Sequence, residues 1–135
     1  MVTLITNILL RYRALDLPIL YFVAFLTRVG FGVIVIAFPH YVTADSLVTG
    51  IVLSIYPLFE AVSAAPAGMY VDRHGRKRVL LFGLTSITIL TFLLGLSRDT
   101  LFIAVIHGVM GVSAAAVIVS TLTMITDLTK ISDRG

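Results

Sequence analysis

The chain has 135 residues, of which 59% are hydrophobic and only 13% are charged, and its mean hydropathy is +1.07. Soluble domains carry about 25% charged residues, and the apolar residues here form long blocks, so the composition predicts a membrane protein. The net charge is +3, but the bases flank apolar blocks, which favours a role in membrane topology and excludes nucleic acid as a partner. The absence of cysteine excludes disulfides and thiolate metal sites.

Four apolar stretches are long enough to cross the hydrocarbon core of a bilayer, which needs about 20 residues of helix. We therefore predict an all-α membrane protein that forms a single membrane domain over residues 1–135. Residues 1–15 are expected to be a cytoplasmic, partly interfacial lead-in, since no signal-peptide pattern is present. Residues 71–78 are expected to be a cytoplasmic loop, and residues 127–135 a cytoplasmic tail. The predicted spans are Leu17–Pro39, Ser46–Tyr70, Val79–Ser97 and Leu101–Thr126.

Turn and cap residues predict where these helices begin and end. Asp16 followed by Pro18 is typical of a helix start, with an N-cap and a proline in the first turn. Pro39 is expected to end the first span, and Asp45 to cap the second. Residues 97–100 leave room only for a tight turn, so spans three and four are predicted to be antiparallel neighbours.

The distribution of bases predicts the orientation in the membrane. Cytoplasmic segments are enriched in lysine and arginine. With the N-terminus inside, eight of the 10 bases fall on the inner side, Arg98 falls outside, and Arg28 lies within the first span. We therefore expect a multi-pass protein of the cell membrane with both termini cytoplasmic. The inner bases are Arg11, Arg13, Arg73, Arg76, Lys77, Arg78, Lys130 and Arg134.

Small residues recur at helical three- and four-residue spacing in the second and fourth spans. In lipid, such stripes let helix backbones approach closely and pack. The stripes comprise Ala61, Ala64, Ala65 and Gly68 in the second span and Gly108, Gly111 and Ala115 in the fourth.

Arg28 and Glu60 are the charged residues within the predicted spans. A central arginine is costly in the bilayer, so Arg28 must face protein or a water-filled cavity and have a partner, for which Glu60 is the natural candidate. Two interpretations stay open: a structural ion pair, or a site for an anion, a substrate or a coupling proton. Glu60 is the residue that would take up a coupling proton if it titrates.

His107, in the outer third of the fourth span, is the third candidate in this cavity, either as a proton relay or as a packed core histidine. His40 and His74 lie outside the spans, and no histidine pair has metal-ligand spacing, so neither a metal nor a cofactor is predicted. An enzyme is not predicted either, because the sequence has no nucleophile–base pair and no phosphate-binding loop.

The run from Gly68 to Arg78 reads Gly-Met-Tyr-Val-Asp-Arg-His-Gly-Arg-Lys-Arg. It resembles the G-x-x-x-D-R-x-G-R-K-x signature of the major facilitator superfamily at every specified position, and it lies between the second and third helices, as in that family. Gly30-Phe31-Gly32 with Pro39 and Tyr41 resembles the first-helix pattern of the drug:proton antiporter branch. The run from His107 to Ala114 is similar to the antiporter motif R-x-x-Q-G-x-G-A, with His107 in place of the arginine.

The resemblance implies a twelve-helix fold of two six-helix bundles, of which this chain would supply the first four helices. It implies a secondary transporter that moves small organic solutes or drugs coupled to protons, with the remainder of the transporter as the missing partner. The run from Gly68 to Arg78, called the hinge below, would act as a conformational latch against the other bundle, with Asp127 pairing to Arg76. The latch residues are Gly68, Asp72, Arg73, Gly75, Arg76, Lys77 and Asp127.

Two other classes stay open. The chain could be a self-contained four-helix membrane protein that works as an oligomer, although the strong charge bias argues against a dual-topology dimer. It could also be a non-transporting membrane subunit or a decayed fragment, which would be unstable when expressed alone.

Overall fold

A computed structural model describes the backbone of residues 2–42 and 45–132 and the side chains of residues 17–40, 42 and 45–129. Four of the bases that predict the topology therefore lie outside the described side chains: Arg11, Arg13, Lys130 and Arg134.

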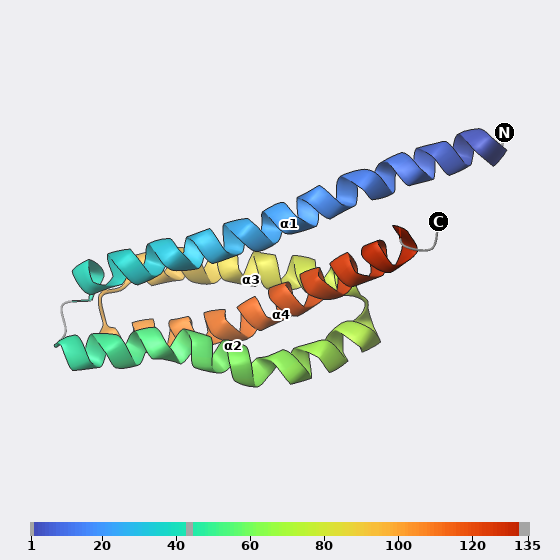
Figure 1. Ribbon diagram of the computed structural model, residues 1–135. Helices are drawn as coiled ribbons and strands as arrows, with labels where there is room; N and C mark the ends of the chain where they lie inside the picture. Colours follow the sequence, from blue (N-terminus) through green and yellow to red (C-terminus); the bar gives the residue numbers. More distant parts are fainter. Residues whose placement is uncertain (1, 43–44, 133–135) are drawn as a thin grey trace.

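The described chain forms four long helices joined by short connections (Figure 1). All four are long and apolar enough to span a membrane, so the all-α membrane fold predicted from the sequence is confirmed. The helices are α1 (Val2–Tyr41), α2 (Ser46–His74), α3 (Arg76–Leu96) and α4 (Thr100–Ser132).

The helices run past several of the predicted ends. The helix start predicted at Asp16 is wrong, because α1 is continuous from Val2 and holds Pro18 in its interior. Membrane helices tolerate such prolines, since neighbouring groups compensate for the lost backbone bond. Pro39 likewise lies two residues before the end of α1. Residues 71–78, expected to be a loop, are helical except at Gly75, since arginine and lysine favour helix and extend their charges into water.

Both connections at the opposite end from Gly75 are capped by an aspartate, of which only Asp45 was predicted from the sequence. The carboxylate of Asp45 accepts a hydrogen bond from the Ser46 amide at 2.8 Å. The Asp99 carboxylate accepts one from the Phe102 amide at 2.7 Å, which satisfies a free donor in the first turn of α4. The short 97–99 turn makes α3 and α4 antiparallel neighbours, as predicted.

Helix α4 lies at the centre of the bundle, with α1, α2 and α3 packed around it (Figure 1). It carries most of the fully buried side chains, whereas α1 leans away from the bundle toward its N-terminal end. The N-terminal end of α1 and the C-terminal end of α4 lie at the same end of the bundle as the α2–α3 junction (Figure 1). The buried α4 residues include Ile103, His107, Met110, Ala115, Val117 and Thr121.

Two glycines allow the helix backbones to approach closely. A methyl group at Gly111 would lie 2.3 Å from the Tyr56 carbonyl oxygen and 3.1 Å from the Glu60 amide nitrogen on α2. A methyl group at Gly83 would lie 3.1 Å from the Ser113 carbonyl oxygen on α4. The α4 stripe is therefore a packing face, as expected from its spacing.

The α2 stripe differs from the expectation of one continuous packing face. Ala61 and Ala65 are exposed in the described bundle, and Ala64 is half-buried. Gly68 faces α4, with room for a methyl group 3.9 Å from Val119. Only part of the α2 stripe thus packs within these four helices.

We predict that Gly111→Ala destabilises the protein by about 1–3 kcal/mol, because the new methyl group collides with the α2 backbone. Thermal unfolding of the detergent-solubilised protein measures the effect. Gly50→Ala is the matched control, since a methyl group there meets no atom within 4 Å and alanine favours helix. Equal melting temperatures for the two variants would contradict this packing.

Candidate functional site

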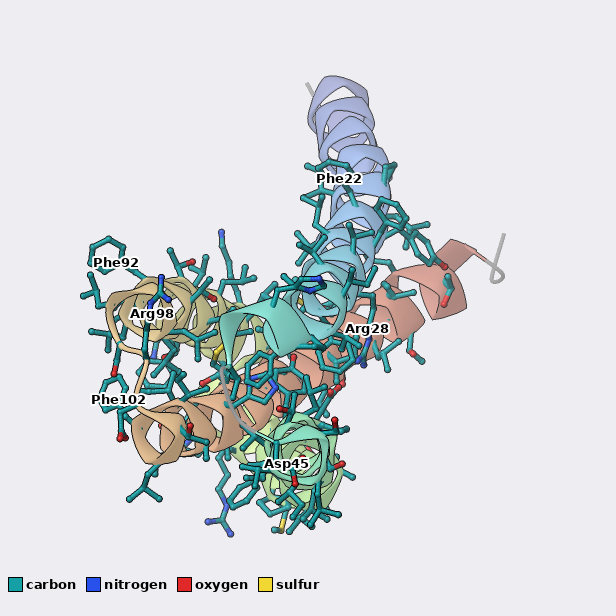
Figure 2. The ribbon with its side chains drawn as sticks, turned by 90° about the vertical axis from the view of Figure 1, so that its left-hand side faces the viewer. Phe22, Arg28, Asp45, Phe92, Arg98 and Phe102 are labelled. Atoms are coloured by element: carbon teal, nitrogen blue, oxygen red, sulfur yellow. The ribbon has the colours of Figure 1, made fainter. Side chains whose placement is uncertain are left out.

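The two charged residues of the predicted spans meet between α1 and α2. Arg28 donates two hydrogen bonds to the Glu60 carboxylate, at 2.7 Å from Nη2 to Oε1 and 3.2 Å from Nη1 to Oε2. The Arg28 side chain is 50% exposed and that of Glu60 14% exposed. Figure 2 shows Arg28 on the side of α1 that faces α2. The bidentate geometry is the strong form of a charge-assisted pair.

This ion pair lies deep in the predicted membrane. Glu60 is the middle residue of the 29-residue helix α2, about 21 Å from either end at the rise of an α-helix. A lone charge at that depth is costly, and pairing removes much of the penalty. Because the Arg28 side chain remains half exposed, the pair faces outward from these four helices rather than into their core.

A row of aromatic rings lies beside the pair. Tyr56, one turn before Glu60 on α2, stacks on Phe31 of α1 with ring centroids 4.7 Å apart. On its other side Tyr56 contacts the His107 ring of α4, with centroids 5.3 Å apart. The ring of Phe38 on α1 also contacts the His107 ring, with centroids 5.0 Å apart. The row thus joins three helices next to the ion pair.

His107 is fully buried, and neither of its ring nitrogens has a hydrogen-bond partner among the described residues. A neutral imidazole carries one donor and one acceptor, and leaving a buried polar group unpaired costs about 1–3 kcal/mol. An imidazolium in this aromatic enclosure would cost far more. The described structure therefore accommodates the neutral form of His107, in contact with Tyr56 but not bonded to Arg28 or Glu60.

The hinge motif forms the junction between α2 and α3. Gly75 is its turning residue, with φ at +89°, a backbone conformation that residues with a Cβ rarely adopt. The Gly75 amide donates to the Val71 carbonyl at 2.9 Å and so ends α2. Arg76, the first residue of α3, forms an ion pair with Asp127 near the end of α4. Asp72, Arg73 and Lys77 are exposed.

The structure thus brings together two of the three candidates in the membrane, Arg28 and Glu60, and places the third behind Tyr56. It also brings together Arg76 and Asp127, 51 positions apart in the chain. The sequence did not reveal Phe31 and Phe38 as neighbours of the site. Their only signal is the seven-residue spacing along α1, which puts both rings on one helix face.

The fold and site define a multi-pass α-helical membrane protein with an ion pair at mid-depth and a basic hinge between its second and third spans. The family model described as the Major Facilitator Superfamily matches residues 19–135. The chain therefore belongs to the major facilitator superfamily, as the hinge motif indicates.

Several curated proteins are similar to the chain. Multidrug resistance protein 2 of Bacillus subtilis (strain 168) is 30% identical over 119 residues, which cover 84% of this chain and 28% of that protein. Multidrug resistance protein MdtG of Proteus mirabilis (strain HI4320) is 32% identical over 105 residues, 72% of this chain and 26% of that protein. The chain therefore spans little more than a quarter of the length of these relatives. No solved structure matches it.

We predict that breaking the ion pair from one side destabilises the protein more than removing both charges. Arg28→Gln leaves the Glu60 carboxylate at mid-depth without its cation, whereas Arg28→Gln with Glu60→Gln leaves two amides that can bond to each other. A double-mutant cycle of unfolding free energies should give a coupling of about 1–2 kcal/mol, since Arg28 is half exposed. Additive effects would show that the pair does not form.

Proposed function

We propose that the chain supplies the first four helices of a secondary active transporter that exports small organic molecules in exchange for protons. The family supports transport, and the names of the relatives, multidrug resistance proteins, support organic molecules as the cargo. The observation that carries the proposal is the Arg28–Glu60 pair, a titratable carboxylate bonded to a permanent cation at mid-depth.

Protonation of Glu60 would uncouple α1 from α2. A proton on either carboxylate oxygen removes the negative charge, so the pair loses its ionic attraction and the guanidinium of Arg28 faces a neutral carboxyl group that accepts its hydrogen bonds less strongly. The Arg28 guanidinium, always protonated, is then left without a counter-charge in a medium where that is costly. It must turn to water or to another anion. Because Arg28 is already half exposed, α1 can make this change without unpacking α4.

The hinge would control which side of the transporter is open. The exposed carboxylate of Asp72 is available to bind the N-terminal end of a helix in another bundle, where the helix dipole favours an acid. Arg73 and Lys77 keep the hinge at the cytoplasmic surface. Arg76 and Asp127 tie the start of α3 to the end of α4, so the latch moves with α4. Gly75 permits the turn that joins α2 to α3.

We predict that Glu60→Gln in the intact transporter abolishes the dependence of export on a proton gradient, because the glutamine carbonyl oxygen can still accept one hydrogen bond from Arg28 but the amide cannot titrate. Substrate efflux from proteoliposomes with and without an imposed pH gradient measures it. Glu60→Asp should keep the dependence with a lower rate. Asp45→Asn, which removes an exposed outer carboxylate, is the matched control.

A Glu60→Gln transporter that responds to the gradient like the unchanged protein would remove Glu60 from the coupling. A Glu60→Gln transporter that binds substrate but does not export it would support the coupling role, because the variant would then have lost only the step that requires the proton.

The proposed orientation, in the cell membrane with both termini cytoplasmic, gives a further prediction. The chain has no cysteine, so single cysteines report position without a background. Arg78→Cys should react with a membrane-impermeant maleimide only in inverted vesicles, and Arg98→Cys only in intact cells. The reverse pattern would overturn the orientation, and with it the cytoplasmic latch.

A further inference from the structure

An apolar groove of about 300 Å³ runs along the outer surface of α2, α3 and α4 near the hinge. Pro66 and Tyr70 of α2 form one wall, Val79 and Phe82 of α3 form the other, and Val112 and Ala116 of α4 form the floor. Phe82 is seven residues from Gly75, so the groove begins within about 10 Å of the hinge at the rise of a helix. None of the residues that line it belongs to the ion pair or to the latch.

Basic residues lie at the hinge end of this groove. Arg73 and His74 come three and four residues after Tyr70, and Arg78 comes four residues before Phe82. Residues at these spacings share a helix face, so all three continue the groove walls toward the membrane surface. Each is exposed. The His74 ring stacks on Tyr70 with centroids 3.9 Å apart, which fixes it at the end of the α2 wall.

The nearest acids do not offset this charge. Asp72 lies two residues from Tyr70 and hence on the opposite face of α2. Asp127 is already paired with Arg76. The groove therefore has an apolar body and a cationic end, which complements a ligand with an apolar chain and an anionic head.

We propose that this groove binds one acidic phospholipid, with an acyl chain between Tyr70 and Phe82 and the headgroup phosphate between Arg73 and Arg78. Its two halves match the two halves of the lipid: the groove wall is apolar where the chain lies, and the bases stand where the headgroup region begins. Basic pockets beside membrane helices select acidic headgroups in this way. A bound lipid would bridge α2 and α3 across Gly75 and restrain the angle between them.

The absence of tryptophan allows a direct test, because Phe82→Trp gives a single fluorescent reporter in the groove. The 135-residue chain is placed in bilayer discs that contain equal mole fractions of brominated phosphatidylglycerol or brominated phosphatidylcholine. Bromine on the acyl chain quenches tryptophan on contact, so free phosphate cannot produce the signal. Discs expose both leaflets, so the result does not depend on the orientation of the chain.

Both brominated lipids can quench the Phe82→Trp reporter, and the apparent affinity derived from the quenching should be at least about threefold higher for phosphatidylglycerol than for phosphatidylcholine. The reason is that two bases lie near the headgroup. Tyr70→Trp, on the facing wall, should report the same preference. Phe22→Trp, on exposed α1, is the control for ordinary boundary lipid and should show none. Circular dichroism checks that each variant keeps its helices.

The preference should vanish in Arg73→Gln/Arg78→Gln and persist in Lys77→Gln, which removes an exposed hinge charge that does not share a helix face with Phe82. Equal quenching by the two lipids in both groove reporters would overturn the proposal. So would a preference that survives the double substitution, or one that Lys77→Gln lowers equally, since the selection would then be a property of the whole surface.

Discussion

The close approach of α4 to α2 is the contact on which the rest of the structure depends. Gly111 lies against the backbone of Tyr56 and Glu60, so the residue that lets the two helices meet touches the residues that form the site. Lipid supplies no hydrophobic drive between helices, and the approach is stabilised by van der Waals contact along a smooth glycine face. The contact between α2 and α4 therefore sets the depth and direction of the Glu60 carboxylate, and the ion pair with Arg28 forms at that position.

Much of this fold could be predicted from composition and pattern, because lipid permits few solutions. Apolar blocks of about 20 residues must be helices, and a charge such as Arg28 must find a partner, which left Glu60 as the candidate. The local signal at Asp45 also identified a real helix end, whereas the end of α2 was predicted at Tyr70 and lies at His74. The start of α1 could not be read in the same way, since a proline in a long membrane helix has the same appearance as one in a first turn.

The surroundings of His107 could not be predicted from the sequence. Its burial, and its position between Phe38 and Tyr56, depend on how α1 and α2 meet α4, and no local spacing encodes contacts between helices. Arg28, Glu60 and His107 were all predicted as candidates for one cavity, because each is a polar residue within a span. The structure separates them: two are bonded to each other and face outward, and the third is enclosed by rings.

The distribution of proline indicates which helices can change shape. Helices α3 and α4 contain none, whereas α1 contains Pro18 and Pro39 and α2 contains Pro57 and Pro66. A helix bends most readily where a proline removes a backbone bond, and Pro57 lies between Tyr56 and Glu60. Helix α4 is an unbroken rod from His107 to Asp127, about 30 Å long. A displacement of Asp127 at the hinge would therefore be transmitted along α4 toward Gly111, and the helix in contact with Gly111 that contains a proline is α2, at the turn that carries Glu60.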